Sequence, residues 1–348
     1  MKHFVAYMLV IFFTVYGGMA AVNYFVDPGH IYSTEYIDKV AEGARKGLNV
    51  EGVTNIDERL YRLKFAEVYK GQSFDYLALG SSRIMTVSED ALKGARLLNM
   101  GVSGCKIEDM IALYQICKDY DIHFKHVIIA SDPTFFNSND KDSRWKSIES
   151  FYNEFLGIHN EEISDLTLYK NLVSPSYFKS ALVMIPSLLK GNNELRYVKT
   201  FINEGGAKRT DGSIYYDRKY RETPQTDIDN GALTWEHGSY HDFSSLSQER
   251  VALFEKLLTS LKKDGVDVSF FFCPFHPSYY KRVQEMRGAI EAFKYVDDYA
   301  RKNNITIIGS FNPDDIGFKN TDFYDAAHAR KESIDVLLKN ELYVRENN

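Results

Sequence analysis

A short apolar segment that ends in glycine and two serines constrains the fold of this chain most. Residues 74–79 read Phe-Asp-Tyr-Leu-Ala-Leu, and Gly80, Ser81, Ser82 and Arg83 follow them. A buried strand that stops at glycine and then presents small hydroxyl residues is how α/β enzymes place reactive groups at the carboxyl edge of a parallel sheet. A serine at this edge becomes nucleophilic only if other segments supply a base and a carboxylate that orients the base.

Further short apolar segments repeat this pattern of strand and turn, and amphipathic segments separate them. The additional predicted strands are residues 96–100, 126–130, 266–272 and 305–309. Predicted helices are residues 57–69, 107–117, 246–263, 278–303 and 329–342, with one more from about Ser88. Strands that alternate with helices predict the α/β class, and we expect a flavodoxin-like three-layer α/β/α arrangement with a parallel sheet.

The N-terminal residues 4–26 form an uninterrupted apolar run of 23 residues without a charge. About 20 such residues cross a bilayer. Because Lys2 precedes the run and Asp27 follows it, the positive-inside rule predicts a cytoplasmic N-terminus and an extracytoplasmic body. A cleaved signal peptide is the alternative, since residues 18–21 are small, but the run continues past them. We expect a single-pass protein of the cell membrane.

The loss of strand–helix alternation in the middle of the chain suggests an insertion. We expect a membrane anchor at 1–28, the first part of an α/β domain at 29–136, an insertion or cap at 137–245, and the second part of the domain at 246–348. Inside the insertion, residues 180–185 favour a helix that Pro186 would end or kink, and residues 213–216 favour a strand.

The amino-acid composition of the chain argues against some classes of ligand. The net charge is −6, from 42 basic and 48 acidic residues, and no long basic block occurs. Nucleic acid is therefore not an expected partner. The three cysteines have no spacing typical of a metal site, so neither a metal nor another cofactor is expected. The sequence is consistent with two states of the cysteines. Either Cys105 and Cys273 form a disulfide, or all three are unpaired buried thiols.

A carboxylate and an imidazole lie close together near the C-terminus. Asp325 precedes His328 by three residues, just ahead of the last predicted helix. In a serine-dependent site, His328 would take the proton from the serine while Asp325 orients the ring. The alternative is that Asp325 only caps the helix.

Three ordered motifs resemble the SGNH (GDSL-like) hydrolase superfamily. They are Gly80-Ser81-Ser82 after the first strand, Asn99-Met100-Gly101 after the second, and Asp325 with His328 near the end. More narrowly, the apolar run and Asn23-Tyr24-Phe25-Val26-Asp27-Pro28 are similar to membrane-anchored members that act on cell envelopes. These include the D-alanine transfer protein of teichoic-acid modification and the acetyltransferase-like proteins of alginate export.

The resemblance implies a role for each matching residue. Ser82 would be the nucleophile, Asp325 and His328 the orienter and base, and the backbone N–H groups of Ser82 and Gly101 two oxyanion donors. The family's third block, Gly-x-Asn-Asp, supplies another donor from Asn, but this chain has Ser131 and Asp132 there. We expect Ser131 or a residue of the insertion to substitute, because one missing donor costs about 2.7–4 kcal/mol.

Three more residues are candidates for substrate binding. Arg83, beside Ser82, would bind an anionic group or pair with a carboxylate, and His276 would line the cleft or serve the structure. Trp235, with His237 and His241, is a candidate rim for a sugar.

The resemblance implies an enzyme that performs extracytoplasmic, serine-dependent acyl transfer or ester hydrolysis. Its substrate would be a cell-envelope polysaccharide, glycolipid or teichoic-acid-like polymer, with an acyl donor and no cofactor. A multi-spanning membrane O-acyltransferase is a candidate partner. The alternative is a non-catalytic accessory protein that binds polymer or docks on such an acyltransferase, which the missing Asn favours. An ordinary α/β-hydrolase is disfavoured because its Gly-x-Ser-x-Gly elbow is absent.

Overall fold

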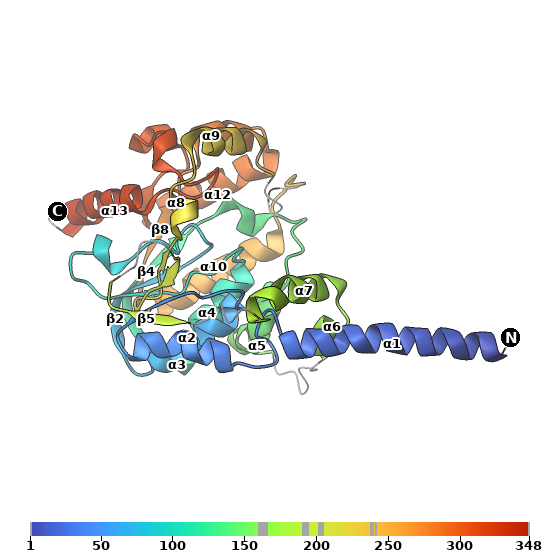
Figure 1. The fold of residues 1–348 in the computed structure, drawn as a ribbon. Coiled ribbons are helices and arrows are strands. Elements are labelled where there is room, and N and C mark those ends of the chain that lie inside the picture. The colour runs from blue at the N-terminus through green and yellow to red at the C-terminus, as the bar shows by residue number, and fades with distance from the viewer. Residues whose placement is uncertain are drawn as a thin grey trace.

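A central sheet of five parallel strands organises the protein (Figure 1). The computed structural model describes residues 2–158, 166–189, 195–200, 205–236, 240 and 242–346. The strands are β2 (Ser73–Leu79), β3 (Leu97–Asn99), β4 (His123–Ala130), β8 (Asp267–Phe272) and β9 (Thr306–Gly309). Their order is β3-β2-β4-β8-β9, and all four pairings are parallel. Counted along the chain this is the order 2-1-3-4-5 of flavodoxin-like sheets.

Side chains alternate between the two faces of this sheet and join two separate cores. Val127 and Ile129 of β4 belong to one core, whereas Ile128 and Ala130 belong to the other. The first core includes residues of α3 (Glu58–Val68), α4 (Ile107–Asp119), α10 (Gln248–Lys263) and α12 (Arg287–Lys302), and the second includes residues of α13 (Lys331–Glu346). Helices therefore pack on both faces. The predicted α/β class and parallel sheet are confirmed, and the arrangement is compatible with three layers.

The predicted helix from about Ser88 is wrong. The structure has only a short 3₁₀ helix there, Glu89–Ala91, before β3. Positive φ angles at Lys93 (48°) and Gly94 (89°) end any helical course. Just before this segment, the Asn99 side chain donates to the carbonyls of Ile84 and Val87, at 2.8 Å each, and so holds the turn after β2 against the end of β3.

Two other helix predictions need correction. The predicted helix 278–303 is two helices, α11 (Pro277–Val283) and α12, separated by a short turn. Pro186 does not end its helix, because α7 (Pro175–Leu189) continues past it.

The predicted insertion pairs with the segment that precedes the central sheet. Strands β5 (Arg196–Val198), β6 (Ala207–Lys208) and β7 (Ile214–Tyr215) form an antiparallel sheet with β1 (Asn49–Glu51), in the order β5-β1-β6-β7. Helices α5 (Glu149–Leu156), α6 (Leu166–Leu172), α7, α8 (Arg218–Arg221) and α9 (Gln225–Thr234) complete this region, and α2 (Glu35–Arg45) precedes β1. The four-part division of the chain stays a prediction.

Helix α1 (Lys2–Val26) projects from the body as a single long rod (Figure 1). The segment from His3 to Val26 is long and apolar enough to cross a membrane, and its most apolar 18 residues are not buried in the body. The three cysteines are buried and unpaired, so no bridge joins Cys105 to Cys273.

Candidate active site

Glycine is required where β2 ends. Gly80 has a φ of +148°, and a Cβ built on it would lie 2.5 Å from the Cβ of Ala130 on the neighbouring strand β4. Any larger residue would therefore clash with β4 or strain the backbone. This close approach lets the chain turn over the carboxyl edge of the sheet, where it presents Ser81 and Ser82.

A hydrogen-bonded line of three side chains begins at Ser82. Its hydroxyl Oγ lies 2.7 Å from His328 Nε2, although 246 positions separate the two residues. The other ring nitrogen, Nδ1, lies 2.9 Å from Asp325 Oδ2 and 3.0 Å from Oδ1. If Nδ1–H donates to the carboxylate, Nε2 has a free lone pair that accepts the proton of the serine hydroxyl. This is the geometry of a nucleophile, a base and an orienting group.

Asp325 is held as an anion by several donors. The backbone N–H groups of Ala327 and His328 donate to Oδ1, both at 2.8 Å. The hydroxyl of Tyr220 donates to Oδ2 at 2.6 Å. Burial alone would raise the pKa of Asp325, but the imidazole of His328 and the donated hydrogen bonds lower it below its ordinary value. The carboxylate therefore stays charged at neutral pH.

Tyr220 and Tyr216 were not predicted from the sequence. Tyr220 lies on α8 in the predicted insertion, and its ring is 4.6 Å from that of Tyr216, which in turn is 6.3 Å from the His328 ring. Burial, then the charge of Asp325, raises the pKa of Tyr220, so its hydroxyl stays a donor. No motif marks these tyrosines, since only the folded chain brings α8 to residues 325–328.

Arg83 does not face the site, which corrects its predicted role in substrate binding. Its buried guanidinium donates to the carbonyls of Ala327 (3.1 Å), Pro274 (2.8 Å) and Cys273, and it pairs with Asp132 at 3.4 Å. It also stacks 3.8 Å from the ring centre of Phe275. The alternative weighed from the sequence, pairing with a carboxylate, is what the structure has.

Two of the three expected oxyanion donors are engaged elsewhere. The N–H of Gly101 donates to the side-chain oxygen of Asn99 at 2.9 Å. Ser131 is buried, its N–H donates to the carbonyl of Phe271 (3.1 Å), and its hydroxyl points to the carbonyl of Ile129 (3.4 Å). Within the described part of the chain, nothing accepts the N–H of Ser82, which leaves this group open to an oxyanion.

Asp132, which follows Ser131 after β4, offers no donor to the site. It is buried, and its carboxylate contacts the hydroxyls of Ser81 (3.3 Å), Thr134 (3.1 Å) and Tyr240 (3.2 Å) besides Arg83. An acceptor-only group cannot stabilise an oxyanion. Its role is to hold the turn that carries the serines.

The contacts of His276 and Trp235 indicate structural roles for both residues. His276 is fully buried; its Nε2 lies 3.1 Å from Asp229 Oδ1, and its Nδ1 accepts the N–H of Ser278 at the start of α11. Burial lowers its pKa despite Asp229. Trp235 ends α9 and packs against the larger core, while its carbonyl accepts from Arg282 at 2.8 Å. His237 and His241 lie outside the described residues.

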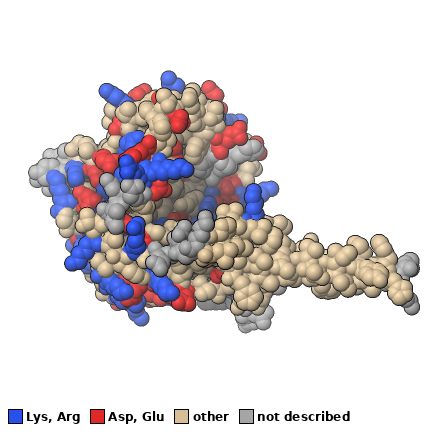
Figure 2. Space-filling model, in the orientation of Figure 1, with Lys and Arg blue, Asp and Glu red and all other residues tan. Residues whose placement is uncertain are grey.

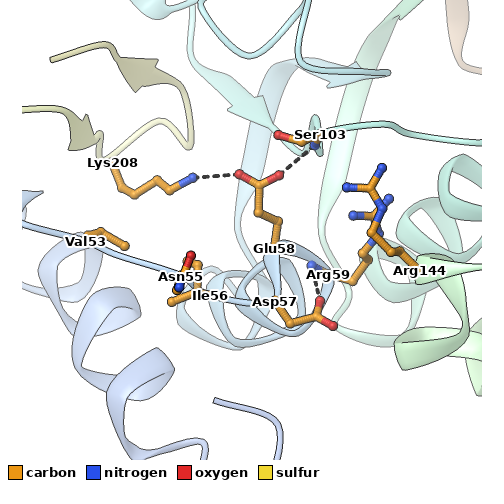
Figure 3. Close-up of a pocket in the computed structure, with 9 residues that line it drawn as sticks. All are labelled: Val53, Asn55, Ile56, Asp57, Glu58, Arg59, Ser103, Arg144 and Lys208. Atoms are coloured by element: carbon orange, nitrogen blue, oxygen red, sulfur yellow. Dashed lines mark hydrogen bonds and ion pairs between the residues drawn. The ribbon is translucent and has the colours of Figure 1, made fainter. Parts of the chain in front are cut away.

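A separate polar pocket of about 380 Å³ opens where residues 53–59 meet β6 (Figure 3). Glu58 lies at its centre, 3.0 Å from Lys208 Nζ, and accepts the N–H of Ser103 at 2.6 Å. None of its nine lining residues is Ser82, Asp325 or His328. Within the described residues, no group of three or more His, Cys, Asp or Glu side chains is placed to hold a metal ion.

Neither the protein-family models nor the curated proteins include a match to this chain. Any function must therefore be argued from the site itself.

Proposed function

We propose that this protein is a membrane-anchored enzyme of the SGNH type that uses Ser82 for acyl transfer or ester hydrolysis at the cell envelope. The single observation that carries the proposal is the line from Ser82 Oγ through His328 to Asp325, with contacts of 2.7 Å and 2.9 Å. Residues from opposite ends of the chain meet there in the geometry that makes a serine nucleophilic.

The reaction follows from the positions of these groups. The hydroxyl oxygen of Ser82 attacks the carbonyl carbon of an ester or thioester, and His328 Nε2 takes the hydroxyl proton. The resulting imidazolium faces the charged Asp325, which stabilises it. His328 then gives the proton to the leaving alcohol or thiol as the carbonyl re-forms, which leaves an acyl-enzyme. A sugar or polyol hydroxyl, or water, then attacks the acyl carbon while His328 takes its proton. The bond from the acyl carbon to the Ser82 oxygen breaks, and His328 returns the proton to that oxygen.

Two further observations support a cell-envelope substrate. The order of the short motifs in the sequence resembles membrane-anchored members of the superfamily that modify cell-envelope polymers. In addition, helix α1 is long and apolar enough to anchor the body at a membrane. We therefore infer a polysaccharide, glycolipid or teichoic-acid-like polymer as the acyl acceptor, with the body on the extracytoplasmic side.

The test measures ester hydrolysis by the purified full-length protein in detergent. With p-nitrophenyl acetate, we expect release of p-nitrophenol that Ser82→Ala abolishes. Ser81→Ala is the matched control, because Ser81 is the neighbouring hydroxyl but contacts Asp132 and not His328. Equal rates for the wild type and Ser82→Ala on every acyl donor would contradict the proposal.

A non-catalytic role is the second candidate, and one specific observation favours it. The N–H of Gly101 and both donors of Ser131 are already engaged, so the described site offers fewer oxyanion donors than the superfamily pattern. In that case the protein would bind polymer or dock on a membrane-bound O-acyltransferase. Copurification with such a partner, together with full function of Ser82→Ala in cells, would support this role.

A further inference from the structure

Helices α6 and α7 pack against α1 at the end where it enters the body. Figure 1 shows α7 beside the body-proximal end of α1, so two segments far apart in sequence lie together there. This contact is independent of the Ser82 site, and the catalytic proposal does not use it.

Polar contacts fix α1 to this helical pair. Asn23, a buried amide near the end of the apolar helix, donates to the carbonyls of Asn171 (3.1 Å), Leu172 (2.7 Å) and Ser174 (3.3 Å). These carbonyls lie where α6 ends, and helix ends leave such groups without partners inside the helix. Tyr177 of α7 donates to Asp27 at 2.6 Å, just past the end of α1. A chain within or beside lipid must satisfy its polar groups internally. The amide NH₂ group of Asn23 and the hydroxyl of Tyr177 are satisfied in this way, whereas the side-chain oxygen of Asn23 is buried without a partner among the described residues.

Several large exposed side chains of α6, α7 and their connection are apolar, although Lys170 and Lys179 are exposed on these helices as well. Val183 is 72% exposed and Leu189 is 83% exposed, at the far end of α7. The other exposed apolar side chains on or next to these helices are Tyr169, Val173, Leu182 and Leu188, and Tyr24 and Phe25 continue the surface on α1. Figure 2 shows that uncharged residues extend without a break from α1 onto this part of the body.

Exposed apolar side chains are scarce on the rest of the body. Among the described residues outside α1, α6, α7 and their connection, the large ones are Ile158, Leu233, Ile290 and Val336. Scattered single residues of this kind are normal, whereas a contiguous patch marks a contact with a membrane or a protein.

We propose that α6 and α7 form a second membrane-contacting element, which inserts its exposed apolar face into the lipid bilayer beside α1. The depth of α1 supports lipid as the occupant. A 25-residue helix is about 37 Å long, and the hydrocarbon core is about 30 Å thick. The last turns of α1, which α6 and α7 contact, therefore lie at the interface between acyl chains and headgroups. With two contacts instead of one, the body has a fixed orientation on the membrane.

This proposal rests on α1 crossing the bilayer and not on acyl chemistry, so its test contains no activity measurement. Full-length protein carrying Val183→Cys or Leu189→Cys is labelled with an environment-sensitive fluorophore and reconstituted in phosphatidylcholine–phosphatidylglycerol vesicles. Val336→Cys is the matched control, because Val336 is 59% exposed on α13, away from α1. The native cysteines are buried, and burial raises the pKa of Cys117 and Cys273 to about 12, so they react slowly.

We expect lipids that carry a quencher to quench the labels at 183 and 189 at least twofold more than the label at 336. Quenching by aqueous iodide should be weaker for the labels at 183 and 189 than for the label at 336. Equal iodide quenching at all three positions in these vesicles would overturn the proposal. Protection from iodide that occurs only in native membranes, and not in pure lipid, would also overturn it, because a protein partner would then cover this face.

Discussion

At the scale of single residues, the candidate site depends on side chains that lie far apart in the sequence. Ser82 follows β2, His328 precedes α13, and Tyr220 comes from α8 between them. The hydroxyl of Tyr220 is 2.6 Å from Asp325 Oδ2 but 3.5 Å from His328 Nδ1, so its strong hydrogen bond is the one to the carboxylate. Its proposed role is therefore to position the carboxylate.

Replacing Tyr220 by Phe should lower kcat for ester hydrolysis about tenfold, which corresponds to about 1.4 kcal/mol in the barrier. The change removes one donor to Asp325, so the carboxylate orients the His328 ring less firmly, while KM should stay the same. Tyr216→Phe is the matched control, since the Tyr216 ring packs on Tyr220 and its hydroxyl is not bonded to Asp325 in the described structure. Equal losses of kcat in both variants would argue against positioning by Tyr220.

The residues that could be predicted from the sequence are those whose local pattern carries the chemistry. Asp325 and His328 are three positions apart, and Ser82 follows a strand that ends in glycine, so the short spacing already places each group at a turn. Arg83 and His276 show the limit of this reasoning, because their side-chain partners Pro274 and Asp229 come from distant segments. Ser131 is buried, and its hydroxyl points to the carbonyl of Ile129 on its own strand.

At the scale of secondary structure, buried cations join the ends of separate elements. Arg83 connects the turn after β2 to Asp132 after β4, to the carbonyls after β8 and to the segment that carries His328. Arg62 of α3 likewise donates to the carbonyls of Gly101 (2.6 Å) and Gly212 (2.8 Å), and so links the central sheet to the predicted insertion.

Arg83→Ala should destabilise the protein by about 3–5 kcal/mol, because it leaves Asp132 charged, buried and without its cation. The expected readout is a large drop in the midpoint of thermal unfolding in detergent. Arg96→Ala serves as the control, since Arg96 is exposed and stacks on Phe74 at 4.4 Å. A drop for Arg83→Ala no larger than that of the control would show that this guanidinium does not hold the strand ends together.

The Glu58–Lys208 pair between α3 and β6 should make stability depend on pH in the acid range. Burial by itself would raise the pKa of Glu58, but Lys208 and the Ser103 amide lower it to about 2 from an ordinary 4.5. The stabilisation, at most about 3 kcal/mol, is complete above pH 4.5 and disappears as the pH falls towards 2.

Thermal unfolding of Glu58→Gln at a series of pH values tests this pair. The variant should be less stable than the wild type at pH 7, and the difference should shrink below pH 4.5. Glu35→Gln is the control, because Glu35 is fully exposed where it pairs with Lys39. If the difference in stability between Glu58→Gln and the wild type stays constant down to pH 2, the titration of Glu58 does not control stability in this range.

The strands were more predictable than the helices for a physical reason. Short apolar segments such as β8 are buried on both faces, so their position follows from hydrophobicity alone. The link after Ser88 and the break between α11 and α12 depend on tertiary contacts. In the first, the carboxylate of Asp211 accepts the N–H of Glu89 at 2.9 Å, and in the second the carbonyl of Phe243 accepts the N–H of Gly288 at the start of α12.

At the scale of the whole molecule, the account places a parallel α/β body next to a membrane. Helix α1 is long and apolar enough to anchor the protein, and the body holds Ser82 at the carboxyl edge of its sheet. The sequence predicted this outline from hydropathy and strand order, but it could not predict the antiparallel sheet β5-β1-β6-β7, whose strands are only two or three residues long.

The sidedness of this arrangement is predicted by the positive-inside rule. Alkaline phosphatase fused to the C-terminus of the full chain should be active in cells, because this enzyme folds only after export. A reporter protein that is active only in the cytoplasm should be inactive when it is fused at the same position. The reverse result would place the body in the cytoplasm and exclude a cell-envelope substrate.

Covalent trapping of Ser82 tests the central claim most directly. The full-length protein is treated with a fluorophosphonate, and the modified peptide is identified by mass spectrometry. The account predicts modification at Ser82, and at least a hundredfold slower modification in His328→Ala, since a serine without its base is a weak nucleophile. Absence of label on Ser82, or labelling at an unchanged rate in His328→Ala, would contradict it.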